Sequence, residues 1–307
     1  MTFLSLASLG RNHIWRYAAT LVATLLTFLA AHVPMIAVVQ SHAAEFGADE
    51  IDRIMVEQGL PGLGVDANLA LALNLFPFAL GLAALLLCVR YIHRRPVLSV
   101  LTSRARFDWA RLGVAGGVWF VVAGGIALWA IPGEAMRLQF ALSTFLPLLA
   151  VALVLVPFQV AAEEVLFRGW MLQGLGRIFA RPVLPLLIVT LVFAAVHLGN
   201  PEFANGLLRV APVYLLLSLF FGLLAVVDDG LEMPIGAHLG NNLFSALVLS
   251  TSDGALRTDS VFQTEVTTVI DHLWTLAPAI PLALVALHLI YRFDWSRLWR
   301  THARPAA

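Results

Sequence analysis

The sequence predicts an all-α, multi-pass integral membrane protein with about eight transmembrane helices. The chain of 307 residues is 60% hydrophobic and only 12% charged, and its mean hydropathy is +0.86. Such a composition is typical of membrane proteins. Apolar runs long enough to cross a bilayer, which needs about 20 residues, recur along the whole chain. Because these runs leave no stretch for a separate soluble unit, we predict one integral-membrane domain over residues 1–307.

The predicted helices follow one another with mostly short connections. The first run could be mistaken for a signal peptide, but its apolar core is too long for one. The fourth run is the longest, and at about 1.5 Å per residue it would extend roughly 55–60 Å, more than a bilayer needs. We therefore expect it to tilt, to kink near Gly169 or to project from the membrane. The expected ranges are 15–39, 69–91, 112–131, 140–179, 183–198, 207–227, 234–249 and 272–291.

The charges between these runs indicate an orientation. Arginines gather near both ends of the chain and between the second and third helices, whereas acidic residues dominate the loop 41–68. The positive-inside tendency then places both termini in the cytoplasm and the protein in the cell inner membrane. The acidic loop Asp228–Glu232 is an exception on the inside, but acidic residues contribute little to this tendency. The formal net charge of zero gives no indication of nucleic-acid binding.

One heptapeptide occurs twice. Residues 106–112 (Arg-Phe-Asp-Trp-Ala-Arg-Leu) resemble residues 292–298 (Arg-Phe-Asp-Trp-Ser-Arg-Leu), and both copies fall at predicted cytoplasmic helix ends. Aromatic side chains at the lipid headgroups with arginines beyond them are typical of an interfacial anchor. In the third helix, the glycine pairs 116–117 and 124–125 predict close approach of a neighbouring helix.

The most informative stretch is Ala161–Arg168, which places two carboxylates and a guanidinium in an apolar helical run. An ionisable group at membrane depth costs about 3 kcal/mol or more on insertion scales, so it needs a partner or a purpose. Glu164 and Arg168 are four residues apart and share a helix face, so we predict that they pair. Glu163 is rotated by about 100° and is left to face something else. We predict that the paired Glu164 has a positioning role and that the unpaired Glu163 takes part in the chemistry.

Two histidines and an asparagine follow on later helices. The turn near Arg181 separates two antiparallel arms, with Glu163 about 18 residues before it and His197 about 16 after it. At helical rise both lie roughly 25 Å from the turn, and we expect them to face each other. His238 and Asn242 share one face of the seventh helix, and they reach the same depth only if the turn protrudes beyond the membrane.

A carboxylate, two imidazoles and an amide can hydrolyse a peptide bond in two ways. The carboxylate with one histidine can take a proton from water, while the second histidine and the amide stabilise the oxyanion. Alternatively, Glu163, His197 and His238 could bind Zn²⁺, which would acidify the water. The residues leave both routes open, so a zinc ion or no cofactor is possible.

Three motifs in this order resemble the CPBP family, the CAAX-protease and bacteriocin-processing membrane proteases also called Abi or Rce1-type. They are Glu163-Glu164-x-x-x-Arg168, Phe193-x-x-x-His197 and His238-x-x-x-Asn242. The resemblance implies an all-helical intramembrane endopeptidase, a hydrolase of the CAAX-protease class often labelled metalloprotease, with its protease core at about 140–250.

The resemblance also implies roles for these residues. Glu163 and His197 would activate water, and His238 and Asn242 would stabilise the oxyanion. Glu164 would belong to the catalytic group, while Arg168 and Phe193 would shape the site. The partners would be the lipid bilayer and a membrane-associated peptide or protein, whose identity the sequence leaves open.

Two other function classes compete with the protease. The first is a non-catalytic bacteriocin-immunity or membrane scaffold protein of the same fold, which would have no need for all four of Glu163, His197, His238 and Asn242. The second is a transporter, because buried carboxylates and histidines also build proton relays. No inverted repeat with paired broken helices supports transport.

Overall fold

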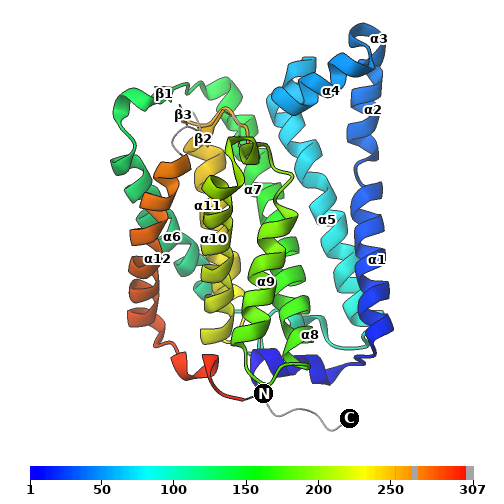
Figure 1. The fold of residues 1–307 in the computed structure, drawn as a ribbon, viewed down its shortest axis with the longest axis vertical. Helices are drawn as coiled ribbons and strands as arrows, with labels where there is room; N and C mark the ends of the chain where they lie inside the picture. Colours follow the sequence, from blue (N-terminus) through cyan, green and yellow to red (C-terminus); the bar gives the residue numbers. More distant parts are fainter. Residues whose placement is uncertain (253, 265–268, 302–307) are drawn as a thin grey trace.

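The computed structural model describes residues 1–252, 254–264 and 269–301 and is an antiparallel helical bundle (Figure 1). Helical segments occur in all eight predicted regions. They are α1 (Ile14–Ala30) with α2 (Val33–Ser41), α5 (Ala67–Tyr91), α6 (Trp109–Ala130), α7 (Leu142–Glu164) with η5 (Val165–Met171) and α8 (Leu172–Gly176), α9 (Val183–Val196), α10 (Leu207–Val227), α11 (Glu232–Leu247) and α12 (Val269–Tyr291).

The prediction of an all-α multi-pass membrane protein is confirmed, with an approximate helix count. In the part of the chain that the structure describes, six helices are long and apolar enough to cross a membrane. The helix α9 is apolar but has only 14 residues, about 21 Å at helical rise. The helix α11 has 16 residues, and none of them is exposed. Both helices are shorter than the roughly 20 residues that a membrane-spanning helix needs. They pack against longer helices of the bundle.

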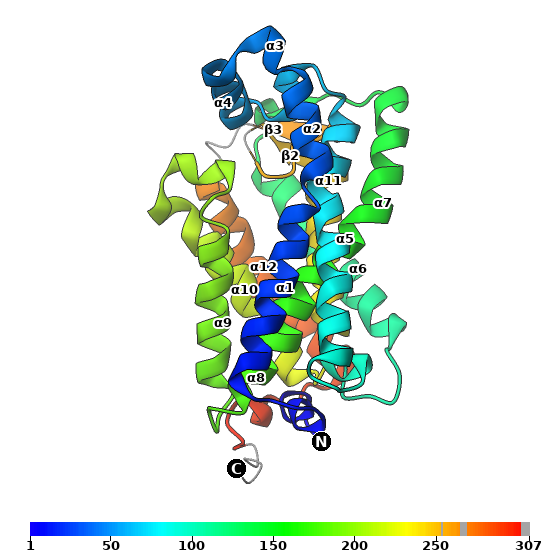
Figure 2. The ribbon, with the colours of Figure 1, turned by 90° about the vertical axis from the view of Figure 1, so that its right-hand side faces the viewer.

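The helix α11 lies at the centre of the bundle, between α6, α7 and α10. The helix α7 packs against α11, and α10 packs against both α9 and α11. The helices α5 and α1 lie beside α7 on one side, and α6 and α12 lie on the other (Figure 1). Figure 2 shows α3 (Ala43–Phe46) and α4 (Ala48–Glu57) at one end of the bundle and α8 at the other.

Two regions differ from the expected loops. The acidic segment 41–68 contains α3, α4 and the 3-10 turn η2 (Leu60–Leu63). The helix α4 is amphipathic, and Ile51 and Ile54 pack against the leucines of η2. A small sheet, in the order β1-β3-β2, forms from three-residue strands. They are β1 (Met136–Leu138), β2 (Leu249–Thr251) and β3 (Phe262–Thr264).

Glycines allow α6 and α11 to approach at backbone distance. A Cβ atom on Gly236 would lie 2.1 Å from the carbonyl oxygen of Leu112, and one on Gly116 would lie 2.9 Å from that of Gly236. The predicted close approach at Gly116 is therefore confirmed. Because α11 carries His238 and Asn242, this contact fixes the distance of both side chains from α6.

The irregularity predicted near Gly169 is a π-helical segment, η5. A Cβ atom on Gly169 would lie 2.5 Å from the carbonyl oxygen of Val100, so only glycine allows the chain to pass there. Short π-helical segments inside α-helices occur frequently at functional sites. Here η5 begins directly after Glu164 and contains Arg168.

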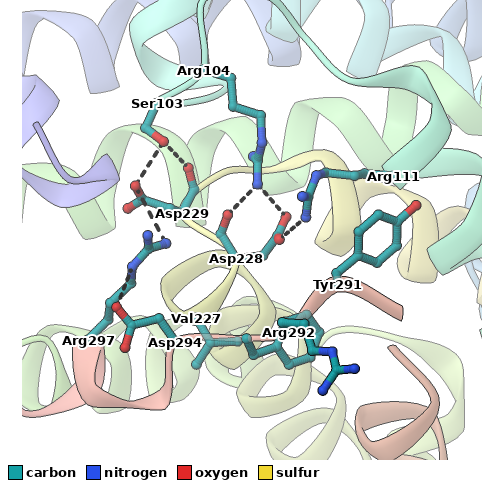
Figure 3. Close-up of a pocket in the computed structure, with 11 residues that line it drawn as sticks. Ser103, Arg104, Arg111, Val227, Asp228, Asp229, Tyr291, Arg292, Asp294 and Arg297 are labelled. Carbon is teal, nitrogen blue, oxygen red and sulfur yellow. Dashed lines mark hydrogen bonds and ion pairs between the residues drawn. The ribbon is translucent and has the colours of Figure 1, made fainter. Parts of the chain in front are cut away.

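The two copies of the heptapeptide converge at the turn between α10 and α11 (Figure 3). In each copy the aspartate caps a helix and pairs with the arginine three residues later: Asp108 with Arg111, and Asp294 with Arg297. Arg111 also pairs with Asp228, and Arg297 lies 3.5 Å from Asp229. The role of both copies as interfacial anchors stays a prediction. The structure adds a second role, because both copies contact the acidic loop Asp228–Glu232.

We call this group the charged cluster, and most of its side chains line an open pocket of about 270 Å³. Arg104 extends it by pairing with Asp228 at 3.1 Å and with Glu232 at 3.0 Å. The cluster consists of Arg104, Arg111, Arg297, Asp228, Asp229, Asp294 and Glu232. Because Glu232 is the first residue of α11, these ion pairs hold the start of the helix that carries His238 and Asn242.

Candidate active site

Glu163 lies near the end of α7, and its two carboxylate oxygens have different surroundings. Its Oε1 accepts a hydrogen bond from Nε2 of Gln159, one turn earlier, at 2.5 Å. Its Oε2 is buried and has no hydrogen-bond partner within the described structure. The sequence predicted a carboxylate with no local partner, and this holds for one oxygen only. Oε2 is therefore the oxygen of Glu163 that no donor of the described protein occupies.

Glu164 and Arg168 form the predicted pair. Nη1 of Arg168 donates to Oε1 of Glu164 at 3.0 Å, and both side chains are fully buried. Nη2 of Arg168 donates to the hydroxyl and carbonyl oxygens of Ser218 in α10. Ser218 thus satisfies part of the buried pair, whereas Nε of Arg168 and Oε2 of Glu164 have no hydrogen-bond partner within the described residues.

His197 caps the C-terminus of α9 and faces Glu163. Its Nδ1 lies 2.6 Å from the carbonyl oxygen of Phe193, which can only accept a hydrogen bond. We therefore assign the proton of neutral His197 to Nδ1, which leaves Nε2 as an acceptor. Nε2 lies 3.9 Å from Oε2 of Glu163, a separation that one water molecule can bridge.

His238 lies between the two glutamates. Its Nδ1 is 2.8 Å from Oε1 of Glu164, and its Nε2 is 3.8 Å from Oε2 of Glu163. Because Glu164 is paired with Arg168 and accepts, Nδ1 of His238 carries a proton. Nε2 can then donate a hydrogen bond only when both ring nitrogens are protonated.

Asn242 lies one turn after His238 on α11, as its spacing predicted. Its Nδ2 donates to Oε1 of Gln159 at 2.8 Å, and its Oδ1 accepts from Nδ2 of Asn241 at 3.1 Å. An amide nitrogen carries two protons, so Nδ2 of Asn242 keeps one proton for another acceptor.

Phe193 connects several of these groups. Its carbonyl oxygen orients His197, and the guanidinium of Arg168 lies over its ring at 4.3 Å from the centroid. On the opposite wall, Phe221 stacks on the ring of His238 at 4.7 Å. These aromatic rings limit the rotation of both the imidazoles and the guanidinium, so the polar atoms keep their mutual distances.

The exposure of these side chains increases from Glu164 towards His197. Glu164 and Arg168 are 0% exposed, His238 6%, Glu163 10% and His197 17%. The polar group is therefore closed behind Glu164 and reachable along the edge formed by Glu163 and His197. All five residues predicted for the catalytic group lie in one contiguous polar cluster, although their roles stay predictions.

Sequence reasoning missed three contributors, namely Gln159, Asn241 and Trp119. Gln159 is an uncharged polar residue four positions before Glu163 in an otherwise apolar run. That spacing is a signal that could have found it, because residues four apart share a helix face. Asn241 and Trp119 carry no such local signal, since their contact joins α11 to α6.

The donors predicted for zinc are not arranged as a metal site. Zinc ligands lie about 2.0–2.2 Å from the ion, so tetrahedral ligands lie roughly 3.4 Å apart. Oε2 of Glu163 lies 3.9 Å from His197 and 3.8 Å from His238. Within residues 1–252, 254–264 and 269–301, no three His, Cys, Asp or Glu side chains are grouped so that they could hold a metal ion. We therefore derive no step through a metal.

Comparisons with known proteins agree with the three motifs. Residues 142–244 match a family model described as type II CAAX prenyl endopeptidase Rce1-like. This segment carries an Rce1-like region. It begins at the first residue of α7 and ends within α11, so it contains Glu163, His197, His238 and Asn242. The predicted resemblance to the CPBP family is confirmed.

A curated relative extends the similarity over most of the chain. The "Uncharacterized protein YyaK" of Bacillus subtilis (strain 168) is 28% identical over 249 residues, which cover 78% of this chain and 80% of the relative. No solved structure matches the chain. At the level of the family, the Rce1-like region supports a CAAX-protease-like intramembrane endopeptidase, a hydrolase that acts on peptides.

Proposed function

We propose that the protein cleaves peptide bonds of membrane-associated proteins or peptides with a water molecule activated by Glu163. The observation that carries the proposal is the unpartnered Oε2 of Glu163, which faces Nε2 of both His197 and His238 inside a buried polar cluster. A buried carboxylate oxygen without a partner is costly. A water molecule between these three atoms would satisfy it and would place the nucleophile.

In the proposed reaction, water donates one hydrogen bond to Oε2 of Glu163 and one to Nε2 of His197. Glu163 takes the first proton as the water oxygen attacks the carbonyl carbon of the substrate. The resulting oxyanion accepts hydrogen bonds from Nδ2 of Asn242 and from Nε2 of doubly protonated His238. The protonated Glu163 then gives its proton to the leaving amine, so one water molecule is consumed for each bond cleaved.

The supporting residues hold this group from behind. Glu164 orients His238 through Nδ1, and Arg168 compensates the charge of Glu164. Phe193 keeps Nε2 of His197 directed at Glu163 by accepting from Nδ1. Substrates with a CAAX-type prenylated terminus fit the description of the matched family. They are the first class to test.

The decisive experiment compares the termini of membrane proteins in cells that carry wild type, Glu163→Gln or Glu134→Gln. Glu134 is exposed, so its variant makes the same chemical change outside the site. We expect new termini with wild type and Glu134→Gln and none with Glu163→Gln. Identical termini in all three strains, at equal expression, would contradict proteolysis and favour the immunity or scaffold alternative.

A further inference from the structure

We propose that Gln159 is a positioning residue. It makes the last link in a directed chain of hydrogen bonds that runs from Trp119 through Asn241, Asn242 and Gln159 to Glu163. The inference rests on the proposed function, because it assigns a role within the same site. It concerns residues on three helices, α6, α11 and α7, whose side chains contact one another in sequence.

The chain has four hydrogen bonds. Nε1 of Trp119 donates to Oδ1 of Asn241 at 3.2 Å, and Nδ2 of Asn241 donates to Oδ1 of Asn242 at 3.1 Å. Nδ2 of Asn242 donates to Oε1 of Gln159 at 2.8 Å, and Nε2 of Gln159 donates to Oε1 of Glu163 at 2.5 Å. Each side-chain amide therefore accepts from the residue before it and donates to the one after it.

Both ends of the chain fix its direction. An indole nitrogen can only donate, and an ionised carboxylate can only accept. If any amide between them were turned over, two donors or two acceptors would face each other. The orientation of Asn241, Asn242 and Gln159 is therefore determined by Trp119 and Glu163 together. Hydrogen bonds that point the same way along a chain also strengthen one another.

This direction has two consequences for the reaction. The hydrogen bond from Gln159 occupies Oε1 of Glu163, so that Oε2 alone faces the histidines. It also presents Nδ2 rather than Oδ1 of Asn242 on the side of Gln159, which leaves the second amide proton for the oxyanion. Gln159 thus joins the proposed base to the proposed oxyanion donor without reaching the substrate itself.

The test uses Gln159→Met, which keeps the length of the side chain and removes both hydrogen bonds. The matched control is Gln173→Met, because Gln173 is also buried on the same helical run but bonds Arg95 and Ser99 instead. Purified proteins in vesicles are assayed with an internally quenched farnesylated peptide ending in a CAAX sequence. Glu163→Gln gives the background rate.

We expect Gln159→Met to lower kcat per folded molecule by about 10- to 100-fold with little change in KM, because a misplaced base slows the chemical step. Gln173→Met should lower the melting temperature but keep kcat within about twofold of wild type. Trp119→Phe, which removes only the first donor, should reduce kcat less than Gln159→Met. Equal kcat values for Gln159→Met and Gln173→Met would overturn the proposal.

An infrared measurement tests the hydrogen bond independently of any cleavage. The carboxylate bands of Glu163 are obtained by subtracting the Glu163→Gln spectrum, once in the wild-type background and once in the Gln159→Met background. A shift of these bands between the two backgrounds supports the proposed contact, and identical bands overturn it. Should wild type cleave no peptide and create no new termini, the proposed function fails while this measurement still decides the role of Gln159.

Discussion

Two buried charged groups of this protein are built from similar residues but differ in how completely their charges are paired. In the charged cluster, each carboxylate has an arginine partner: Arg104, Arg111 or Arg297. In the candidate site, Glu164 has Arg168, but Glu163 has only the neutral amide of Gln159 and two imidazoles at 3.8 and 3.9 Å.

This difference distinguishes the structural role of the carboxylates in the charged cluster from the chemical role proposed for Glu163. A carboxylate with guanidinium groups beside it is held in a fixed position by charge-assisted contacts, and it thereby connects separate parts of the fold. A buried carboxylate with an unpartnered oxygen costs stability, and such strain is typical of functional sites. The same residue type therefore holds α11 in place at Glu232 and is proposed to activate water at Glu163.

The largest expected effect comes from making the same change in each group. Glu163→Gln should reduce turnover by about 10²- to 10⁴-fold, the contribution of a general base, while the melting temperature stays near that of wild type. Glu232→Gln should do the reverse, because it weakens the pair with Arg104 and the contact with the backbone of Asp108. Kinetics and thermal unfolding of both variants in detergent test this. A stability loss in Glu163→Gln as large as in Glu232→Gln would remove the distinction.

The next effect concerns the paired half of the site. Arg168→Ala should destabilise the protein by about 3–5 kcal/mol, because it leaves Glu164 charged and fully buried. Unfolding in denaturant measures the loss. The double variant Arg168→Ala/Glu164→Gln should recover part of it, since the uncompensated charge is gone. An unchanged stability of Arg168→Ala would contradict the ion pair.

His93 is a buried side chain that is uncharged at neutral pH, and it lies at the same end of the bundle as the charged cluster. Burial lowers the pKa of His93 to about 4. Its Nε2 accepts from the indole of Trp170, and its Nδ1 contacts the carbonyl oxygen of Arg11. A protonated ring would lose the bond to Trp170, since both of its nitrogens would then donate.

This pKa predicts a loss of stability in acid. Well above pH 6.5, the ordinary pKa of histidine, the ring is neutral in both the folded and the unfolded chain. As the pH falls from 6.5 towards 4, the unfolded chain takes up a proton that the folded chain excludes, so stability falls, by about 2 kcal/mol at pH 5. Thermal unfolding from pH 7.5 to 5 measures this. His93→Gln should flatten the dependence, whereas His13→Gln, an exposed position, should leave it. An equal slope in both variants would contradict the assignment.

The smallest effect compares the two copies of the heptapeptide. Arg111 pairs with Asp228, whose side chain is 4% exposed, and Arg297 pairs with Asp229, which is 13% exposed. Arg111→Gln should cost about 1–3 kcal/mol, because it weakens a hydrogen bond to a buried charge. Arg297→Gln should cost less, at most about 1 kcal/mol, because its contact with Asp229 is longer, at 3.5 Å, and more accessible to solvent. Equal melting temperatures would show that both arginines contribute alike.

Local spacing was sufficient to predict several contacts correctly. The i, i+4 relation paired Glu164 with Arg168 and placed His238 and Asn242 on one face of α11. Apolar runs located the helical regions, since a bilayer demands long apolar segments. The small sheet was not predicted, because its three-residue strands are too short to produce a pattern in the sequence.

The sequence by itself determined the membrane fold, the order of the helices and the residues from which the candidate site is drawn. Only the tertiary structure decided that Gln159 joins Glu163 to Asn242, that His238 lies between two glutamates, and that both heptapeptides meet at Asp228 and Asp229. The physical reason is that periodicity fixes which residues share a helix face, but not how far that helix is rotated or how deep it lies beside its neighbours. Contacts such as Gly116 with Gly236 set that rotation, and they join residues more than 100 positions apart.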